Sequence, residues 1–112
     1  VFMLEMDFGV VKGMTIVKLT GELTSNTFYK FNEEVDYLLY SQGMHYFVFD
    51  FKDVDKIEEK VFDEIQSKII EIFLNYGKVV IYGIKCAFKN IKDSTRLFYA
   101  KDEIEALKCF SI

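Results

Sequence analysis

The sequence predicts an α/β fold in which a mixed sheet of four to five strands carries about four helices, in the order β-β-α-β-α-β-α-β-α. Two observations favour this class. Short runs rich in β-branched and aromatic residues alternate with longer segments whose apolar residues recur at spacings of three and four. Single glycines and polar residues separate these segments, and the chain has no proline. Strands that alternate with helices need crossover connections, so we expect helices to cover a partly parallel sheet.

The first two strands are expected to form a hairpin. Residues 1–11 are rich in β-forming side chains, and residues 14–19 alternate apolar and polar side chains at period two. Gly13 separates the two runs. Gly21 is expected to end the second strand.

A helix is expected next. Thr24, Ser25 and Asn26 have side chains of the kind that cap helix N-termini, and the helix is expected to end near Gly43. Its buried face is expected to hold four apolar residues at helical spacing: Phe28, Phe31, Val35 and Leu38.

The middle of the chain predicts a buried strand and the longest helix. Residues 45–51 form a β-branched and aromatic run that is typical of a central strand, and residues 52–56 are expected to be a polar loop. The helix that follows is expected to stop at Gly77. Charged residues lie opposite its apolar face, which consists of Phe62, Ile65, Ile69, Ile72 and Phe73.

Four short elements are expected in the last part of the chain. These are a strand at residues 78–82, a short helix at residues 84–92, a short strand at residues 96–100 and a last helix at residues 101–110. Because 112 residues is a usual size for one domain, we expect residues 1–112 to form a single domain.

The composition excludes several classes of function. Eighteen acidic residues against fourteen basic ones give a net charge of −4, whereas nucleic-acid binding needs a clustered basic surface. The apolar runs are far shorter than the roughly 20 residues of a transmembrane segment. Cys86 and Cys109 are far apart and His45 is the only histidine, so neither a metal site nor another cofactor is expected. Nothing requires an oxidising compartment, and a cytoplasmic location is expected.

Two side chains are candidates for catalysis, and neither supports it. Asp50 is expected at the end of the central strand, where open α/β sheets place functional groups. The acidic pair that holds Mg²⁺ in phosphoryl-accepting receiver domains is missing, so we interpret Asp50 as a solvated carboxylate. His45 has no nucleophile motif beside it and is expected to be a partly exposed structural residue. We therefore do not expect an enzyme.

Three short motifs occur in a recognisable order. Residues 21–23 are Gly-Glu-Leu after a strand, Asp53 and Val54 follow the central strand, and residues 77–81 are a strand that begins with glycine. From about Thr15 to the C-terminus, this order resembles the STAS domain of anti-sigma factor antagonists. The resemblance implies a STAS-like mixed sheet.

The resemblance also implies where the functional turn lies. In the family, a D-S-S-G turn begins the second helix, and its second serine is phosphorylated by a partner anti-sigma kinase. A gap-free alignment places Glu58 over the acidic residue, Glu59 over the first serine, Lys60 over the phosphorylated serine and Val61 over the glycine. The acceptor hydroxyl is absent at Lys60, and Thr24 replaces the Asp of the family's G-E-L-D turn.

Two interpretations of this turn remain open. In the first, Glu58 and Glu59 imitate the charge of a phosphorylated turn and hold the domain in one regulatory state. In the second, the opposite charge of Lys60 defeats that mimicry. Ser25 and Thr27, beside the G-E-L-D turn, are the alternative phosphate acceptors.

On this resemblance we expect a non-catalytic protein-interaction module that binds an anti-sigma factor or a serine kinase. It would be a bacterial regulatory protein that acts in signal transduction and transcription, without the usual serine switch. The alternative is a STAS-like module that binds a small ligand, either a nucleotide or a lipid. The expected partner-binding residues are Glu22, Thr24, Ser25, Asn26, Asp55, Lys56, Glu58, Glu59 and Lys60.

Overall fold

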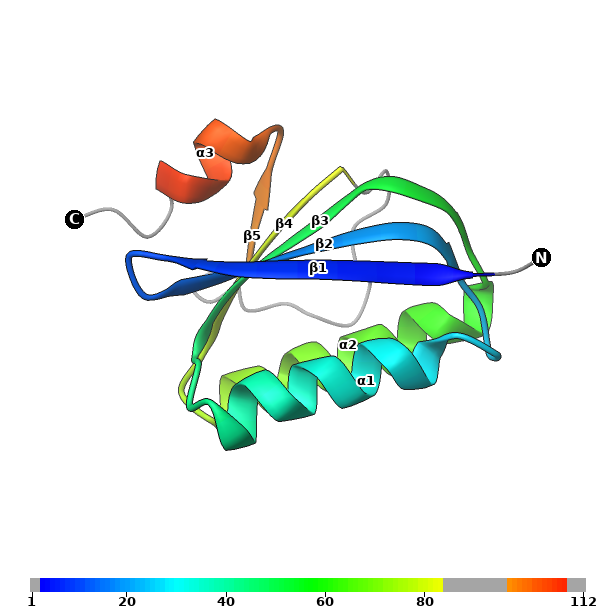
Figure 1. Ribbon diagram of the computed structural model, residues 1–112, viewed down its shortest axis with the longest axis horizontal. Coiled ribbons are helices and arrows are strands. Elements are labelled where there is room, and N and C mark those ends of the chain that lie inside the picture. Colours follow the sequence, from blue (N-terminus) through cyan, green and yellow to red (C-terminus); the bar gives the residue numbers. More distant parts are fainter. Residues whose placement is uncertain (1–2, 84–96, 109–112) are drawn as a thin grey trace.

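The computed structural model describes residues 3–83 and 97–108, and these form a five-stranded sheet with the strands in sequence order (Figure 1). Strand β1 pairs with β2 in antiparallel fashion, and β2, β3, β4 and β5 pair in parallel. The mixed sheet predicted from the sequence is confirmed. The strands are β1 (Leu4–Val11), β2 (Met14–Leu23), β3 (Tyr46–Ile57), β4 (Lys78–Tyr82) and β5 (Leu97–Ala100).

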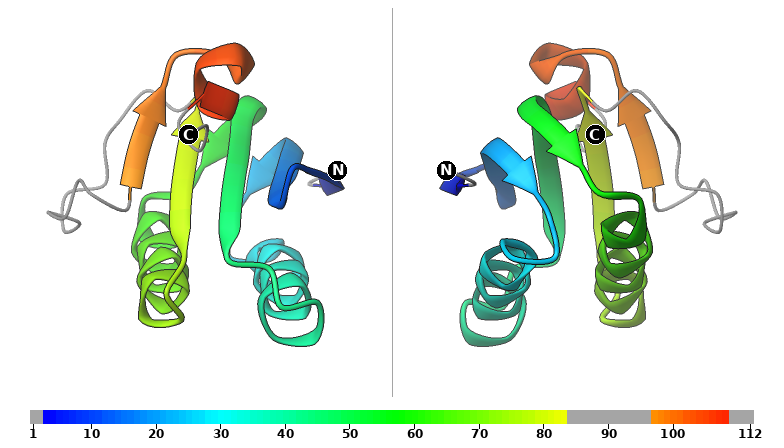
Figure 2. Two further views of the ribbon diagram at one scale, coloured as in Figure 1. Left: turned by 90° about the vertical axis from the view of Figure 1, so that its left-hand side faces the viewer. Right: turned by 90° about the vertical axis from the view of Figure 1, so that its right-hand side faces the viewer.

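Helices cover both faces of the sheet. Figure 2 shows α1 and α2 side by side beneath the sheet and α3 on the opposite side. A π-helical turn, η1, continues α1. The described residues therefore hold three α-helices, and the fourth expected helix, at residues 84–92, lies outside them. The helices are α1 (Phe28–Asp36), η1 (Tyr37–Ser41), α2 (Glu59–Leu74) and α3 (Glu103–Lys108).

The main core lies between the sheet and the helices α1 and α2. Phe47, Phe49 and Phe51 alternate along β3 toward these helices and are almost completely buried. The Phe49 ring lies 5.4 Å from that of Phe31 on α1 and 5.7 Å from that of Phe47, measured between centroids. Burial of each such side chain stabilises the fold by about 1.5–3 kcal/mol. These contacts fix α1 and α2 beneath β3.

A second, smaller core lies under α3. It contains buried side chains from β3, β4, β5 and α3, namely Val48, Val80, Tyr82, Ala100 and Ala106. Strands β3 and β4 are thus buried on both faces, which explains why they read as continuous apolar runs in the sequence.

Strand β3 is longer than predicted, and the expected loop at residues 52–56 is wrong. These residues continue the strand and pair with the end of β2, with Thr20 opposite Asp53 and Glu22 opposite Lys56. A register irregularity between Lys18 and Thr20 lets the strand continue. The prediction failed because most of residues 52–56 are polar and exposed or half-buried, a composition that is also typical of loops.

Gly21 does not end β2, contrary to the sequence-based expectation. It lies inside the strand with φ +111°, which other residues rarely adopt. A Cβ atom there would overlap the Met3 carbonyl oxygen, and Met3 accepts a hydrogen bond from the Glu22 amide at 3.0 Å. The glycine therefore permits a close approach of two backbones.

Candidate functional site

The turn between β2 and α1 lies beside the N-terminus of α2, at the end of the sheet where β2 and β3 finish (Figure 1). The Ser25 amide donates a hydrogen bond to Glu58 Oε1 at 3.0 Å. The Glu58 amide donates to the Leu23 carbonyl at 2.9 Å. Two segments that are 33 residues apart thus form one surface, which we call the turn surface.

Two threonines hold the turn before α1. Thr27 Oγ1 accepts a hydrogen bond from the Thr24 amide at 2.9 Å and donates one to the Glu22 carbonyl at 2.8 Å. Thr24 Oγ1 accepts from the Asn26 amide at 3.2 Å. Both threonines are buried, whereas Ser25 and Asn26 are exposed. The N-cap of α1 is Thr27, so the expected capping role of Thr24, Ser25 and Asn26 is wrong.

The burial of Thr24 and Thr27 limits the contact that either side chain can make with a partner. Thr24 shapes the turn and offers little side-chain surface to a partner. Thr27 is also enclosed, because its hydroxyl bridges two backbone groups. Its position directly before the first apolar residue of the helix could have indicated the N-cap, but not this bridge, because the Thr27 side chain makes no hydrogen bond to its own helix.

The first turn of α2 presents the Glu-Glu-Lys segment. Glu58 is the N-cap residue, and its carboxylate binds the Ser25 amide in place of an amide of its own helix. Glu59 and Lys60 are exposed. An acidic residue in a first turn is stabilised by the positive end of the helix dipole. Val61, where the family has glycine, is completely buried, so it anchors the start of the helix in the core.

A shallow groove adjoins the turn surface. It has a volume of about 310 Å³ and is lined by Met3, Glu5, Thr20, Gly21, Glu22 and Asp55. Three of these side chains are carboxylates, and Glu22 Oε2 is buried without a hydrogen-bond partner among the described residues. Sequence reasoning missed Glu5, which reaches the groove because β1 places it opposite Thr20.

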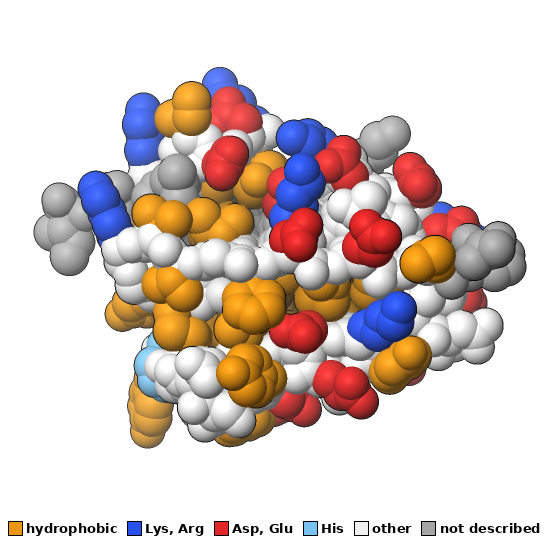
Figure 3. All heavy atoms as spheres, viewed as in Figure 1, with side chains coloured by type: hydrophobic (Ala, Val, Ile, Leu, Met, Phe, Trp, Pro, Cys, Tyr) orange, Lys and Arg blue, Asp and Glu red, His pale blue; other side chains and the backbone are white. Residues whose placement is uncertain are grey.

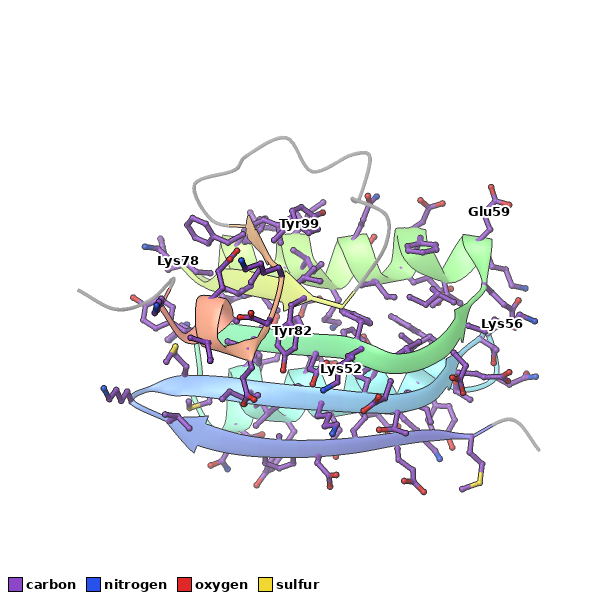
Figure 4. All side chains as sticks on the ribbon, turned by 90° about the horizontal axis from the view of Figure 1, so that it is seen from above. Lys52, Lys56, Glu59, Lys78, Tyr82 and Tyr99 are labelled. Atoms are coloured by element: carbon purple, nitrogen blue, oxygen red, sulfur yellow. The ribbon has the colours of Figure 1, made fainter. Side chains whose placement is uncertain are left out.

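All nine predicted partner-binding residues lie at this end of the molecule. Figure 4 shows Lys56 and Glu59 there, far from Lys78. The pairing of β2 with β3 sets Lys56 opposite Glu22, and Asp55 precedes it in the same strand. The sequence prediction thus named a set of residues that the fold brings together.

Asp50 is not the solvated strand-end carboxylate that the sequence predicted. It lies in the middle of β3 with 4% exposure. Its Oδ1 accepts the Lys52 amide at 2.9 Å, and burial together with a hydrogen bond to Asp50 raises the pKa of the Tyr82 hydroxyl far above its ordinary value. Asp50 therefore supports the irregularity in β3 and the packing under α3.

A polar cluster fixes α1 and η1 against α2. The buried Lys68 ammonium donates to Asp36 at 2.6 Å and to Glu71 at 3.1 Å. Burial alone would lower the pKa of Lys68, but hydrogen bonds to these two carboxylates outweigh it and raise the pKa. The pKa of Glu71 is lowered, mainly by a hydrogen bond from the Tyr40 hydroxyl and to a smaller extent by Lys68. The cluster sets the relative position of the two helices that flank the turn surface.

In residues 3–83 and 97–108, no group of three or more His, Cys, Asp or Glu side chains is arranged to hold a metal ion. None of the helices in the same residues combines the length and the apolar character that a membrane span requires. Two shallow hollows of about 310 and 340 Å³ are present, and both open to solvent.

The fold is similar to those of three solved structures. The anti-sigma factor antagonist SpoIIAA in its unphosphorylated form superposes with a TM-score of 0.64 at 12% identity, over 96% of this chain and 94% of that one. The Bacillus cell fate determinant SpoIIAA in its phosphorylated form gives 0.62 at 13% identity, over 96% and 97%. An uncharacterised Shewanella loihica PV-4 protein with a SpoIIAA-like fold gives 0.54 at 12% identity, over 96% and 94%.

Sequence comparison identifies the family. We found no curated protein with significant sequence similarity to the chain. The STAS domain family model, however, matches residues 5–105, which include β1 from its second residue onward, the strands β2 to β5 and the helices α1 and α2. The chain therefore belongs to the STAS domain family.

Proposed function

We propose that this STAS domain is a non-catalytic interaction module that binds an anti-sigma factor or a related serine kinase through the turn surface. One observation carries the proposal: the bond between the Ser25 amide and the Glu58 carboxylate unites the β2–α1 turn with the N-terminus of α2. The similarity to SpoIIAA, described as an anti-sigma factor antagonist, supports the class of partner.

The charge of the turn surface indicates what the partner must offer. Glu22, Asp55, Glu58 and Glu59 contribute four carboxylates, against the ammonium groups of Lys56 and Lys60. Complementary charge increases the rate of association and selects among partners. We therefore expect a partner with a basic contact surface.

The interaction would not use the family's serine switch. Residues 58–60 carry no hydroxyl group, so this turn cannot accept phosphate. The Glu58 carboxylate already occupies the Ser25 amide, which supports a turn surface held in one state. Binding would then be controlled by the amount of each protein and by the partner.

The small-ligand alternative has less support. Ligand sites usually enclose most of the ligand in a concave, mostly apolar pocket. Two hollows among the described residues, those beside Glu22 and His45, are open to solvent, and the one beside Glu22 is lined by three carboxylates. We place this function second.

An affinity pull-down with identification by mass spectrometry tests the proposal. The site variant is Glu58→Ser, Glu59→Ser, Lys60→Ser. The control variant, Glu33→Ser, Lys101→Ser, Glu103→Ser, removes the same charges from exposed positions elsewhere. We expect the wild type and the control to capture an anti-sigma factor or serine kinase and the site variant to lose at least about 90% of it. Equal capture by all three proteins would contradict the assigned surface.

A further inference from the structure

A second distinctive surface lies at the opposite end of the molecule, whose longest dimension is 42 Å. Residues 8–14, 41–46 and 74–78 meet there, because the strand register sets Met14 opposite Tyr46 and Tyr46 opposite Lys78. The Lys78 amide also donates to the His45 carbonyl at 3.0 Å. We call these three segments the loop end.

The loop end is basic although the chain is acidic. Its three segments contain Lys12, Lys78 and the single histidine, His45, and no Asp or Glu, whereas the whole chain has a net charge of −4. The last carbonyls of α2 accept hydrogen bonds from amides of residues 75–77, so they add little exposed negative charge. Figure 4 shows Lys78 at this end and Glu59 at the other.

Apolar side chains project from the same end. Tyr76 is 86% exposed, Leu74 75% and Val10 59%. Figure 3 shows hydrophobic side chains gathered around the histidine at the left of the view. Tyr76 also borders a hollow of about 340 Å³, whose other lining residues are Gly13, Gly43, Met44, His45 and Tyr46. Exposed apolar side chains that lie together in this way mark contact surfaces.

Two residues of the loop end have a strained backbone. Lys12, with φ 52°, and Tyr76, with φ 65°, are the two non-glycine residues with positive φ in the described part of the chain. Asn and Gly are the residues that such a hairpin turn and such a helix C-terminus ordinarily select. A lysine and a tyrosine occupy these positions at a conformational cost, which favours a role for the side chains themselves.

We propose that the loop end contacts an anionic membrane surface. The ammonium groups of Lys12 and Lys78 would lie among lipid phosphates, and Val10, Leu74 and Tyr76 would enter the boundary between headgroups and acyl chains. Projecting side chains around a hollow suit a deformable lipid surface better than the flat face of a folded acidic protein. This inference goes beyond the proposed function, and it would leave the turn surface pointing away from the membrane.

Cosedimentation with vesicles tests the proposal. The wild type should bind vesicles of phosphatidylcholine and phosphatidylglycerol in a 7:3 ratio much more strongly than vesicles of phosphatidylcholine alone. Each lysine at an anionic surface contributes about a fivefold increase in partitioning, so two lysines predict a preference of about twenty- to thirtyfold. Raising the salt concentration should weaken the binding.

The variant Lys12→Asn, Tyr76→Asn separates binding from folding. Asn tolerates positive φ, so the variant should be at least as thermally stable as the wild type. Its binding to the anionic vesicles should nevertheless fall about tenfold. The control Lys52→Asn, Tyr29→Asn makes the same changes at exposed positions elsewhere and should retain binding.

Either of two results would overturn the proposal. The first is equal binding of the wild type to vesicles with and without phosphatidylglycerol, which would indicate that an acidic protein binds the loop end instead. The second is a stable Lys12→Asn, Tyr76→Asn variant that binds the vesicles as well as the wild type does.

Discussion

Gly21→Ala is the substitution that most sharply tests the strand geometry beside the turn surface. An alanine would have to adopt φ +111° and would overlap the Met3 carbonyl oxygen. The backbone strain costs about 1–3 kcal/mol. Displacing Met3 to relieve the overlap breaks its hydrogen bond with the Glu22 amide, which costs about 1 kcal/mol more. We expect the free energy of unfolding to fall by about 2–4 kcal/mol.

Urea denaturation followed by circular dichroism measures this loss. Gly9→Ala is the matched control, because Gly9 lies in the neighbouring strand without positive φ and with nothing within 4 Å of the added Cβ. The control should be unchanged or more stable by up to about 1 kcal/mol. If Gly21→Ala is as stable as the control, the close approach of Met3 to Gly21 is not present in solution and the groove beside Glu22 has another shape.

Three further predictions concern the helices that flank the turn surface. Lys68→Met should change the free energy of unfolding by less than about 1 kcal/mol in urea denaturation, whereas Asp36→Asn with Glu71→Gln leaves the buried ammonium without a counter-charge and should cost about 2–3 kcal/mol. Because the pKa of Glu71 is lowered in the folded state, its ionised carboxylate stabilises the fold at pH values above 4.5, its ordinary pKa. This contribution disappears as the pH falls through the folded-state pKa. Glu71→Gln should therefore flatten the acid side of a stability profile measured by thermal melting. Val61→Gly, which restores the family's residue, should lower stability by about 2–4 kcal/mol because it empties a fully buried position and adds a glycine to a helix.

Local patterns account for most of the sheet. The hairpin turn at Lys12 and Gly13 determines which residues of β1 and β2 face each other, so the pairing of Glu5 with Thr20 could have been derived from the sequence. The alternation along the first half of β3 likewise predicts a buried strand, because every second residue from Phe47 to Phe51 is aromatic.

Non-local contacts account for what the sequence did not reveal. The burial of Asp50 depends on a second core that is closed by α3, which begins at Glu103, far along the chain, and no local pattern reports it. The extension of β3 through residues 52–56 depends on a change of register opposite Lys18 and Thr20. Sequence spacing also cannot reveal that Ser25 and Glu58 touch.

Amide chemical-shift mapping tests the central claim most directly. Isotope-labelled domain would be titrated with a purified anti-sigma factor of the kinase type, and the change of each assigned amide resonance measured. We expect the largest changes at Ser25, Glu58 and Lys60, together with the loss of these changes in the Glu58→Ser, Glu59→Ser, Lys60→Ser variant. Changes concentrated at Lys12 and Tyr76, or none at saturating partner, would contradict it.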